Sequence, residues 1–254
     1  MAIEHYKTPD VVASTYGPQY TGPDGTVFYP SCGVGSIATL MTSAQWTAAT
    51  VSSTGSPALN NTIEDGFRMT LATTGSTAAL IRQYAAMTFN RNWLPGKNSE
   101  VDWTKPFRIR VPMRLQVGGT GNGFKLTMFF GGLSAAPTVH TMSGKGINLC
   151  ITGTAANTAN VQICAHNGST QVNSTASSQT FDGTLRNLDI WYQPGTGLTL
   201  MLAGVVIGTV ASGSLPTGVS SSACGWAVLL EHTTATNGTS TYQQHPYTVD
   251  FLAP

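Results

Sequence analysis

Charged residues are scarce in this chain, where Asp, Glu, Lys and Arg together make up 9% of 254 residues. An average soluble protein carries roughly 25%. The formal net charge is +1, so there is no electrostatic reason to expect binding to nucleic acid or to an anionic membrane. A surface this poor in charge is unusual for a free protein and favours one that is largely covered by neighbouring chains.

Long apolar runs and zinc-binding spacings are lacking as well. No stretch approaches the roughly 20 apolar residues of a membrane span, and residues 1–9 lack the apolar core of a signal peptide. We therefore expect a protein made in a cytoplasm and not exported by the usual route. No Cys-x-x-Cys pair is present, which argues against a structural zinc, and we predict no cofactor.

The chain has four cysteines, and two of them lie in segments with matching patterns. Residues 147–151 and 161–165 alternate apolar and polar side chains, which predicts two strands of one hairpin. Cys150 and Cys164 then point to the face opposite the apolar one and could lie across from each other. A cytoplasmic protein favours free thiols at these positions, and a cross-strand disulfide is the alternative.

The first 41 residues are rich in proline and glycine, which exclude a long helix or a continuous central strand. They are also rich in aromatic residues, which a disordered tail usually lacks. We predict an extended arm whose aromatics pack on a surface, either that of its own domain or that of a neighbouring subunit, with simple disorder as the third alternative. The candidate partner-binding residues are Tyr6, Tyr16, Tyr20, Phe28 and Tyr29.

The stretch from Leu188 to Val210 predicts three strands joined by two tight turns. Apolar residues recur at every second position of its first two segments, which indicates a sheet with one buried face. Pro194-Gly195 and Ala203-Gly204 provide the turns. The inward set is Leu188, Ile190, Tyr192, Leu198, Leu200 and Leu202.

This stretch resembles the central meander of concanavalin A-like (laminin G-like) sandwich domains. The resemblance is carried by Trp191, Gly195, Gly197, Leu198, Leu200, Leu202 and Gly204. Ala203 stands where the family usually has Asn. The resemblance implies a sandwich that begins near Gln45 and extends to the C-terminus. It implies no particular activity, because function is set by sites added to a fold.

Other alternating segments complete the predicted sandwich. Residues 107–117 predict a strand with Arg108 and Arg110 facing outward, and Pro112 suggests an edge or a bulge. Residues 118–123 predict a hairpin turn, with 124–130 as the partner strand. We predict strands also at 67–71, 225–231 and 247–252, and at 78–89, where a short helix is the alternative. The fold class is therefore all-β: a two-sheet antiparallel jelly-roll sandwich over residues 42–254, behind the extended N-terminal arm of 1–41.

No catalytic pattern is convincing. One glycosidase family of this fold uses Glu-x-Asp-x-x-Glu on a strand. The nearest match here begins Glu100-Val-Asp102 in a loop and has Lys105 in place of the acid. No Gly-x-Ser-x-Gly elbow, phosphate loop or Asp-rich calcium cluster is present. We predict that the protein is not an enzyme.

Two tryptophans in the predicted loop of residues 90–105, Trp93 and Trp103, are the best candidates for stacking against a sugar.

The first functional hypothesis is a structural virion protein of a tailed bacteriophage, located in the virion. It would be a capsid decoration protein or a head or tail fibre component. Its arm would dock to the major capsid protein or other virion proteins, and it would form a homo-oligomer, with a trimer as one candidate. The alternative is a carbohydrate-binding adhesin with a surface glycan as its partner, and a polysaccharide hydrolase is a distant third.

Overall fold

A computed structural model describes residues 20–21, 27–28, 46–50, 55–58, 67–71, 77–83, 101–118, 123–132, 140–142, 144–218, 224–232, 238–244 and 248–251. In strands β1 to β4, β6 and β18 the description covers the backbone. The strands are β1 (Tyr20–Thr21), β2 (Val27–Phe28), β3 (Trp46–Thr50), β4 (Gly55–Ala58), β5 (Phe67–Leu71), β6 (Thr77–Gln83), β7 (Phe107–Gln116), β8 (Phe124–Gly132), β9 (Gly146–Ala155), β10 (Thr158–His166), β11 (Gln171–Asn173), β12 (Ser177–Thr180), β13 (Asp182–Gln193), β14 (Gly197–Leu202), β15 (Val205–Ala211), β16 (Cys224–His232), β17 (Ser240–Gln244) and β18 (Thr248–Phe251). One 3-10 turn, η1 (Ser212–Ser214), is the one helical element in these ranges.

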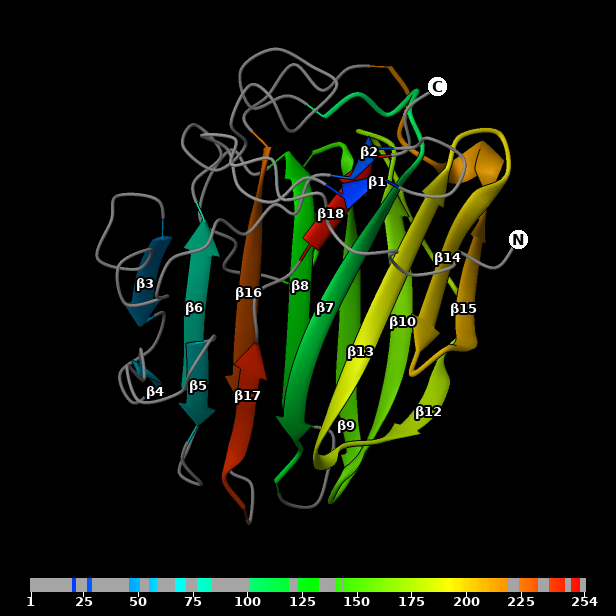
Figure 1. The fold of residues 1–254 in the computed structure, drawn as a ribbon. Helices are drawn as coiled ribbons and strands as arrows, with labels where there is room; N and C mark the ends of the chain where they lie inside the picture. The colour runs from blue at the N-terminus through cyan, green and yellow to red at the C-terminus, as the bar shows by residue number, and fades with distance from the viewer. Residues whose placement is uncertain are drawn as a thin grey trace.

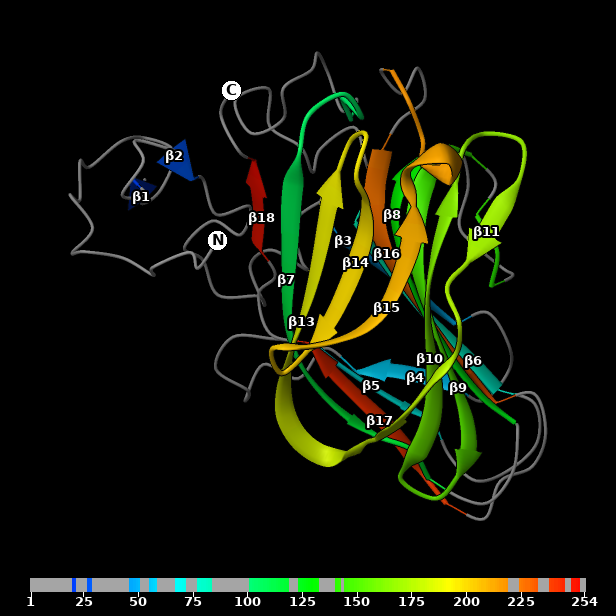
Figure 2. The same cartoon turned by 90° about the vertical axis from the view of Figure 1, so that its right-hand side faces the viewer.

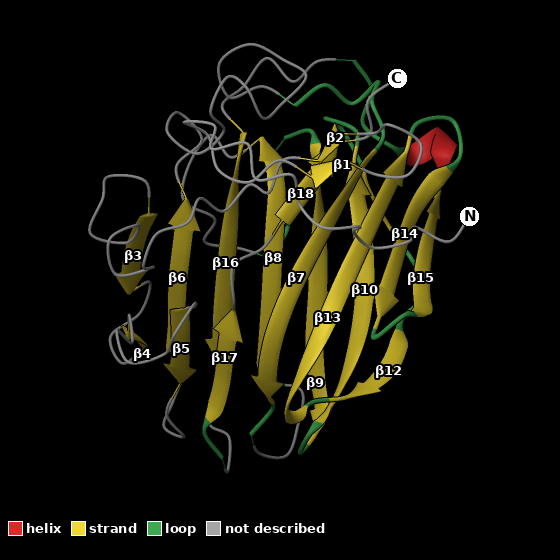
Figure 3. Ribbon diagram, viewed as in Figure 1, coloured by secondary structure: helices red, strands yellow, loops and turns green. Residues whose placement is uncertain are grey.

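Two antiparallel eight-stranded sheets pack face to face, as Figures 1 and 3 show. The front sheet runs β15-β14-β13-β7-β17-β5-β4, with β18 also paired to β7. The rear sheet runs β11-β10-β9-β8-β16-β6-β3, with β12 also paired to β10. Figure 2 shows the two layers from the side. The predicted all-β sandwich is confirmed, and 78–83 belongs to a strand, not to a helix.

The predicted meander is confirmed strand by strand. β13 pairs with β14, and β14 pairs with β15. In β14 buried and half-buried residues alternate, because successive side chains point to opposite faces. Leu198 and Leu200 are fully buried, and burial of each such side chain contributes roughly 1.5–3 kcal/mol. This meander forms one end of the front sheet.

The predicted hairpin of 107–117 with 124–130 is wrong. β7 lies in the front sheet between β13 and the pair β17 and β18, whereas β8 lies in the rear sheet between β9 and β16. Residues 118–123 therefore connect the two layers. Alternation alone shows which side chains are buried, and both arrangements bury the same faces. It cannot show whether two successive strands share a sheet or face each other across the core.

Pro112 lies in the middle of a central strand, not at the predicted edge or bulge. On one side β7 has β13 as a continuous neighbour, with Pro112 opposite Asn187. On its other side β18 pairs with residues 107–110 and β17 with residues 113–116. Proline, which has no N–H to donate, therefore falls where one partner strand has ended and the next has not begun.

The turn between β14 and β15 contains a strained residue. Ala203 has φ +50° and is followed by Gly204 at φ +84°. Residues with a Cβ pay roughly 1 kcal/mol for this left-handed conformation, and Asn tolerates it best. We predict that Ala203→Asn raises the free energy of unfolding by about 0.5–1 kcal/mol, measured by urea titration. Ala211→Asn is the matched control, because Ala211 is exposed and has φ −66°. Equal effects of the two changes would contradict the strain.

The hydrophobic core fills the space between the sheets. Its largest fully buried side chains include Trp103, Tyr192, Tyr242 and Phe107. A second, smaller cluster of Phe129, Met142, Ala227 and Leu229 lies on the outer face of the rear sheet. All four are at most 4% exposed, so this part of the rear sheet is covered. The outer face of the front sheet keeps more of its side chains in solvent.

Candidate functional site

Trp103 is a core residue, so its predicted role as an exposed sugar platform is wrong. It is 1% exposed and lies 5.3 Å from Tyr192, 5.8 Å from Phe107 and 6.2 Å from Phe130, measured between ring centroids. The Tyr192 hydroxyl lies 2.8 Å from the Trp103 carbonyl oxygen and can donate to it. The ring therefore closes one end of the sandwich. Trp93 lies outside the described residues.

The arm residues proposed as partner contacts are described only in part. Tyr20 in β1 pairs with Phe28 in β2, so these two strands form a small sheet of their own. β2 lies beside β18 at the edge of the front sheet. Tyr6, Tyr16 and Tyr29 lie outside the described residues. The role of the arm in binding a partner stays a prediction.

The outer face of the front sheet carries a fixed charge cluster around Asp189. Oδ1 of Asp189 accepts hydrogen bonds from Nε and Nη2 of Arg108, at 2.9 and 2.5 Å, and from Nε of Arg110, at 2.9 Å. The Arg108 guanidinium lies 4.9 Å from the centroid of the Trp191 ring, which suits a cation–π contact. The pairing of β13 with β7 positions the cluster, because it sets Asp189 opposite Arg110 and Trp191 opposite Arg108.

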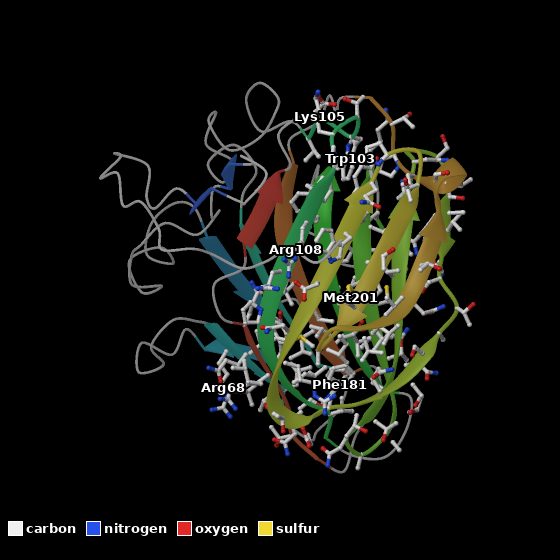
Figure 4. All side chains as sticks on the ribbon, turned by 45° about the vertical axis from the view of Figure 1, so that its right-hand side comes forward. Arg68, Trp103, Lys105, Arg108, Phe181 and Met201 are labelled. Atoms are coloured by element: carbon white, nitrogen blue, oxygen red, sulfur yellow. The ribbon has the colours of Figure 1, made fainter. Side chains whose placement is uncertain are left out.

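A row of polar side chains crosses the same face lower down. Gln243 on β17 pairs with Arg68 on β5 and with Arg114 on β7, so all three share one face in one row. Strands lie about 4.8 Å apart, which places the Cα atoms of Arg68 and Arg114 roughly 10 Å from each other. Figure 4 shows Arg68 and Arg108 on the front sheet.

Three guanidinium groups on this face are available to a ligand. Arg68 and Arg114 are exposed, and the Arg110 side chain is 29% exposed. Arg110 uses Nε for Asp189, and Arg114 makes only a long 3.4 Å contact to the Gly183 carbonyl oxygen. Their other nitrogens have no hydrogen-bond partner among the described residues. We call Arg68, Arg110 and Arg114 the arginine face.

The surroundings of the arginine face are polar, and arginines outnumber carboxylates among its described side chains. Among the described side chains on this face, Asp189 is paired with two arginines, and the exposed Asp182 pairs with Gln116, two residues from Arg114. On β18, Asp250 lies opposite Arg108 in the strand register. In a chain with so little charge this is a local concentration of positive potential. The side chains around it are hydroxyl- and amide-bearing or neutral: Thr70, Pro112, Asn187, Thr199, Met201 and Thr241.

The outer face of the rear sheet carries a second polar cluster. Nε2 of His140 lies 2.5 Å from Oε2 of Glu231, and Nδ1 of His140 lies 2.6 Å from Oγ1 of Thr127. A hydroxyl, an imidazole and a carboxylate in sequence suggest a nucleophile relay, but Thr127 is only 1% exposed and cannot meet a substrate. Burial lowers the pKa of His140, against the opposing effect of Glu231. We interpret the cluster as structural.

Cys150 and Cys164 border this cluster as free thiols. Their Sγ atoms lie 4.0 Å apart, and Cys150 also receives contacts from Asn148 and Thr127. The predicted hairpin is confirmed as β9 and β10. The two cysteines are diagonal neighbours and not directly opposite, because Cys150 faces Gln162 and Cys164 faces Asn148.

Neither a metal-binding cluster nor a membrane-spanning helix is found where the structure is described. No group of three or more His, Cys, Asp and Glu side chains in these ranges could hold a metal ion. No helix there is long and apolar enough to cross a bilayer.

Comparison with known proteins identifies the fold. No family model matches the chain, and no curated protein matches its sequence. Among solved structures, the Emp47p carbohydrate recognition domain is similar over 82% of this chain and 89% of its own, with a TM-score of 0.55 and 11% identity. The chain has the concanavalin A-like fold. The potassium-bound Emp46p carbohydrate recognition domain is similar over 83% of this chain and 90% of its own, with a TM-score of 0.51 and 11% identity.

The sequence predicted which way two arginines face, but it did not single out any arginine as a site residue. The outward positions of Arg108 and Arg110 followed from alternation and are confirmed. The neighbourhood of Arg68, Gln243 and Arg114 did not follow, because these residues come from three strands whose order no local pattern encodes. The one available signal was the alternation in 67–71, where burial of Met69 and Leu71 turns Arg68 outward.

Proposed function

We propose that this domain binds acidic glycans through the arginine face. The observation that carries the proposal is the set of three solvent-facing guanidinium groups on one sheet, with no described carboxylate paired to their terminal nitrogens. Guanidinium groups bind carboxylates and sulfates through paired N–H donors. The ligand class is therefore a glycan with carboxylate or sulfate groups.

Two further features favour a glycan over other polyanions. The solved structures with the same fold are named as carbohydrate recognition domains. The arginine face is interleaved with Thr, Asn and Gln side chains, which can donate and accept hydrogen bonds with sugar hydroxyls. Exposed aromatic side chains on which bases could stack are lacking among its described residues, as Trp191 is half-buried beneath Arg108. Nucleic acid is thereby disfavoured.

The proposal is tested with polygalacturonate, a carboxylated polysaccharide, and dextran, a neutral one. We expect isothermal titration calorimetry to show binding of polygalacturonate that weakens as salt is raised, and no binding of dextran. An equal affinity for a single-stranded DNA of matched charge would contradict glycan recognition, since it would mean that the face responds to charge alone.

Substitution of the arginine face should weaken this binding stepwise. Arg110→Gln or Arg114→Gln should each cost about 1 kcal/mol, roughly fivefold in Kd, because each loses one exposed ionic contact. Arg68→Gln/Arg110→Gln/Arg114→Gln should weaken binding by about 100-fold or more. Lys105→Gln is the control for the single variants, because it also removes one positive charge and Lys105 lies at the other end of the sandwich in Figure 4. A loss as large in the control as in Arg110→Gln or Arg114→Gln would argue against the site.

The virion role inferred from composition stays a prediction. It depends on the arm and on the low charge of the chain, and the side chains of the arm lie outside the described residues. A glycan-binding domain and a virion component are compatible, because an adhesin on a virus particle can have a surface sugar as its ligand. Deletion of residues 1–41 should leave binding of polygalacturonate unchanged, because the arginine face lies entirely within β5 and β7.

A further inference from the structure

Cys150 and Cys164 occupy one face of the β9–β10 hairpin, on the side away from the core. Cys150 lies opposite Gln162 and Cys164 opposite Asn148, so the two cysteines are diagonal neighbours. Their Sγ atoms are 4.0 Å apart, and Cys164 is oriented to donate its S–H to Cys150. The two thiols are therefore in contact without being bonded.

Cys150 lies between two hydrogen-bond donors and one acceptor, the carbonyl oxygen of His140 at 3.7 Å from its Sγ. Nδ2 of Asn148 lies 3.2 Å from its Sγ, and Oγ1 of Thr127 lies 3.8 Å away. Asn148 is 1% exposed and leaves its own Oδ1 without a hydrogen-bond partner while its amide nitrogen donates to the sulfur. A buried N–H group directed at the sulfur favours the charged form of the thiol over the neutral one.

The donors separate the acidities of the two thiols. The hydrogen bond from Cys164, followed by those from Thr127 and Asn148, lowers the pKa of Cys150 to about 7, although burial opposes it. The contact with Cys150 and burial raise the pKa of Cys164. Three charged or titratable groups lie around the pair. They are Lys125 on β8, Glu231 on β16, and His140, which precedes β9. Cys150 is thus the more acidic thiol of the pair, and Cys164 is the one that keeps its proton.

The two thiols also differ in access. Cys164 is 1% exposed, whereas Cys150 is half-buried and keeps contact with solvent. A reagent from solution therefore meets the more acidic thiol first. This arrangement of an accessible thiolate beside a buried thiol is typical of redox-active pairs.

We propose that Cys150 is a modification site for small disulfides and that Cys164 resolves the adduct. The Cys150 thiolate attacks one sulfur of oxidised glutathione, forms a mixed disulfide and expels one glutathione thiolate. Cys164 then gives its proton to the expelled glutathione thiolate, and its own thiolate attacks Sγ of Cys150, which expels the second glutathione thiolate. The protein loses two electrons to form a Cys150–Cys164 bond, and oxidised glutathione gains them as two reduced molecules.

The bond formed is expected to be easily reversed. The sulfurs must approach from 4.0 Å to about 2.05 Å, which requires side-chain rotation. Diagonal neighbours in a sheet have Cα atoms roughly 7–8 Å apart, beyond the range in which most disulfides form. The backbone of the hairpin must therefore adjust, and strained disulfides of this kind are the readily reduced ones.

The experiment separates the two roles. In a Cys32→Ser/Cys224→Ser background, treatment with oxidised glutathione should give an intramolecular disulfide between 150 and 164, seen by mass spectrometry of the intact protein and its peptides. With Cys164→Ser added, the mixed disulfide on Cys150 should accumulate. With Cys150→Ser added instead, reaction at Cys164 should be about 100-fold slower in the folded protein and should recover in urea.

Two results would overturn the proposal. One is reaction of the Cys150→Ser variant at the rate of the Cys164→Ser variant. The other is a mixed disulfide that persists when both thiols are present. The pH dependence of the rate of adduct formation supplies an independent measure. The Cys164→Ser variant keeps the donors Asn148 and Thr127. Asn148→Ala in that variant should move the midpoint of the rate profile to higher pH. An unchanged midpoint would also count against the role given to Asn148.

Discussion

Asp189→Ala is expected to lower the free energy of unfolding by about 3–5 kcal/mol. Asp189 is 6% exposed and its Oδ1 accepts three N–H groups from two arginines. Removal of the carboxylate leaves the buried Arg108 guanidinium without its counter-charge, and a buried unpaired charge is strongly destabilising. The melting temperature should fall by roughly 10 °C or more, measured by calorimetry.

The control for this prediction is Asp182→Ala. Asp182 is exposed and at the start of the same strand, so its removal should change the free energy of unfolding by less than about 0.5 kcal/mol. The loss of unfolding free energy in Asp189→Asn should fall between the losses in Asp182→Ala and Asp189→Ala, because the amide keeps an acceptor oxygen and loses the charge. If Asp189→Ala costs no more than Asp182→Ala, Arg108 finds other partners and the cluster is not what fixes the arginine face.

Trp103→Ala is expected to lower the free energy of unfolding by about 3–5 kcal/mol, as truncation of a buried aromatic side chain usually does. The ring contacts three aromatic side chains and is 1% exposed. Affinity for polygalacturonate, measured well below the melting temperature, should stay unchanged, since Trp103 does not reach the surface. Urea denaturation and calorimetric titration of one preparation give both values.

Trp103→Phe distinguishes packing from other roles of this side chain. Nε1 of Trp103 is buried and has no hydrogen-bond partner among the described residues, so phenylalanine removes an unsatisfied donor as well as some volume. We expect it to cost less than half as much as alanine. A Trp103→Ala protein that keeps its stability and loses glycan binding would restore the surface platform that the sequence suggested.

The sequence predicted best where structure is local. The alternation of 188–210 determined three strands and two turns, because neighbouring residues in the chain remain neighbours in a meander. The same reasoning failed at 118–123, where two alternating segments joined by glycines were taken for a hairpin. A crossing between layers and a turn within a layer have similar local chemistry, and the difference is decided by partners far along the chain.

For the site, the sequence predicted the orientation of single side chains but not which of them lie together. That Arg108 and Arg110 face outward followed from the apolar residues between them. That Asp189 binds both arginines and still leaves the terminal nitrogens of Arg110 available required the register of β13 against β7. Trp103 was assigned to a loop because its segment lacks alternation. The core position of such a residue depends on Tyr192 and Phe130, which no spacing in the sequence links to it.

The order of strands within each sheet has a consequence for biosynthesis. Leu126 of β8 pairs with Leu230 of β16, and Leu115 of β7 pairs with Tyr242 of β17. Both central strands therefore lack one neighbouring strand until the last part of the chain has been synthesised. Domains dominated by such distant pairings fold slowly. A ribosome-bound intermediate of this protein should consequently display unpaired strand edges to chaperones until translation is nearly finished.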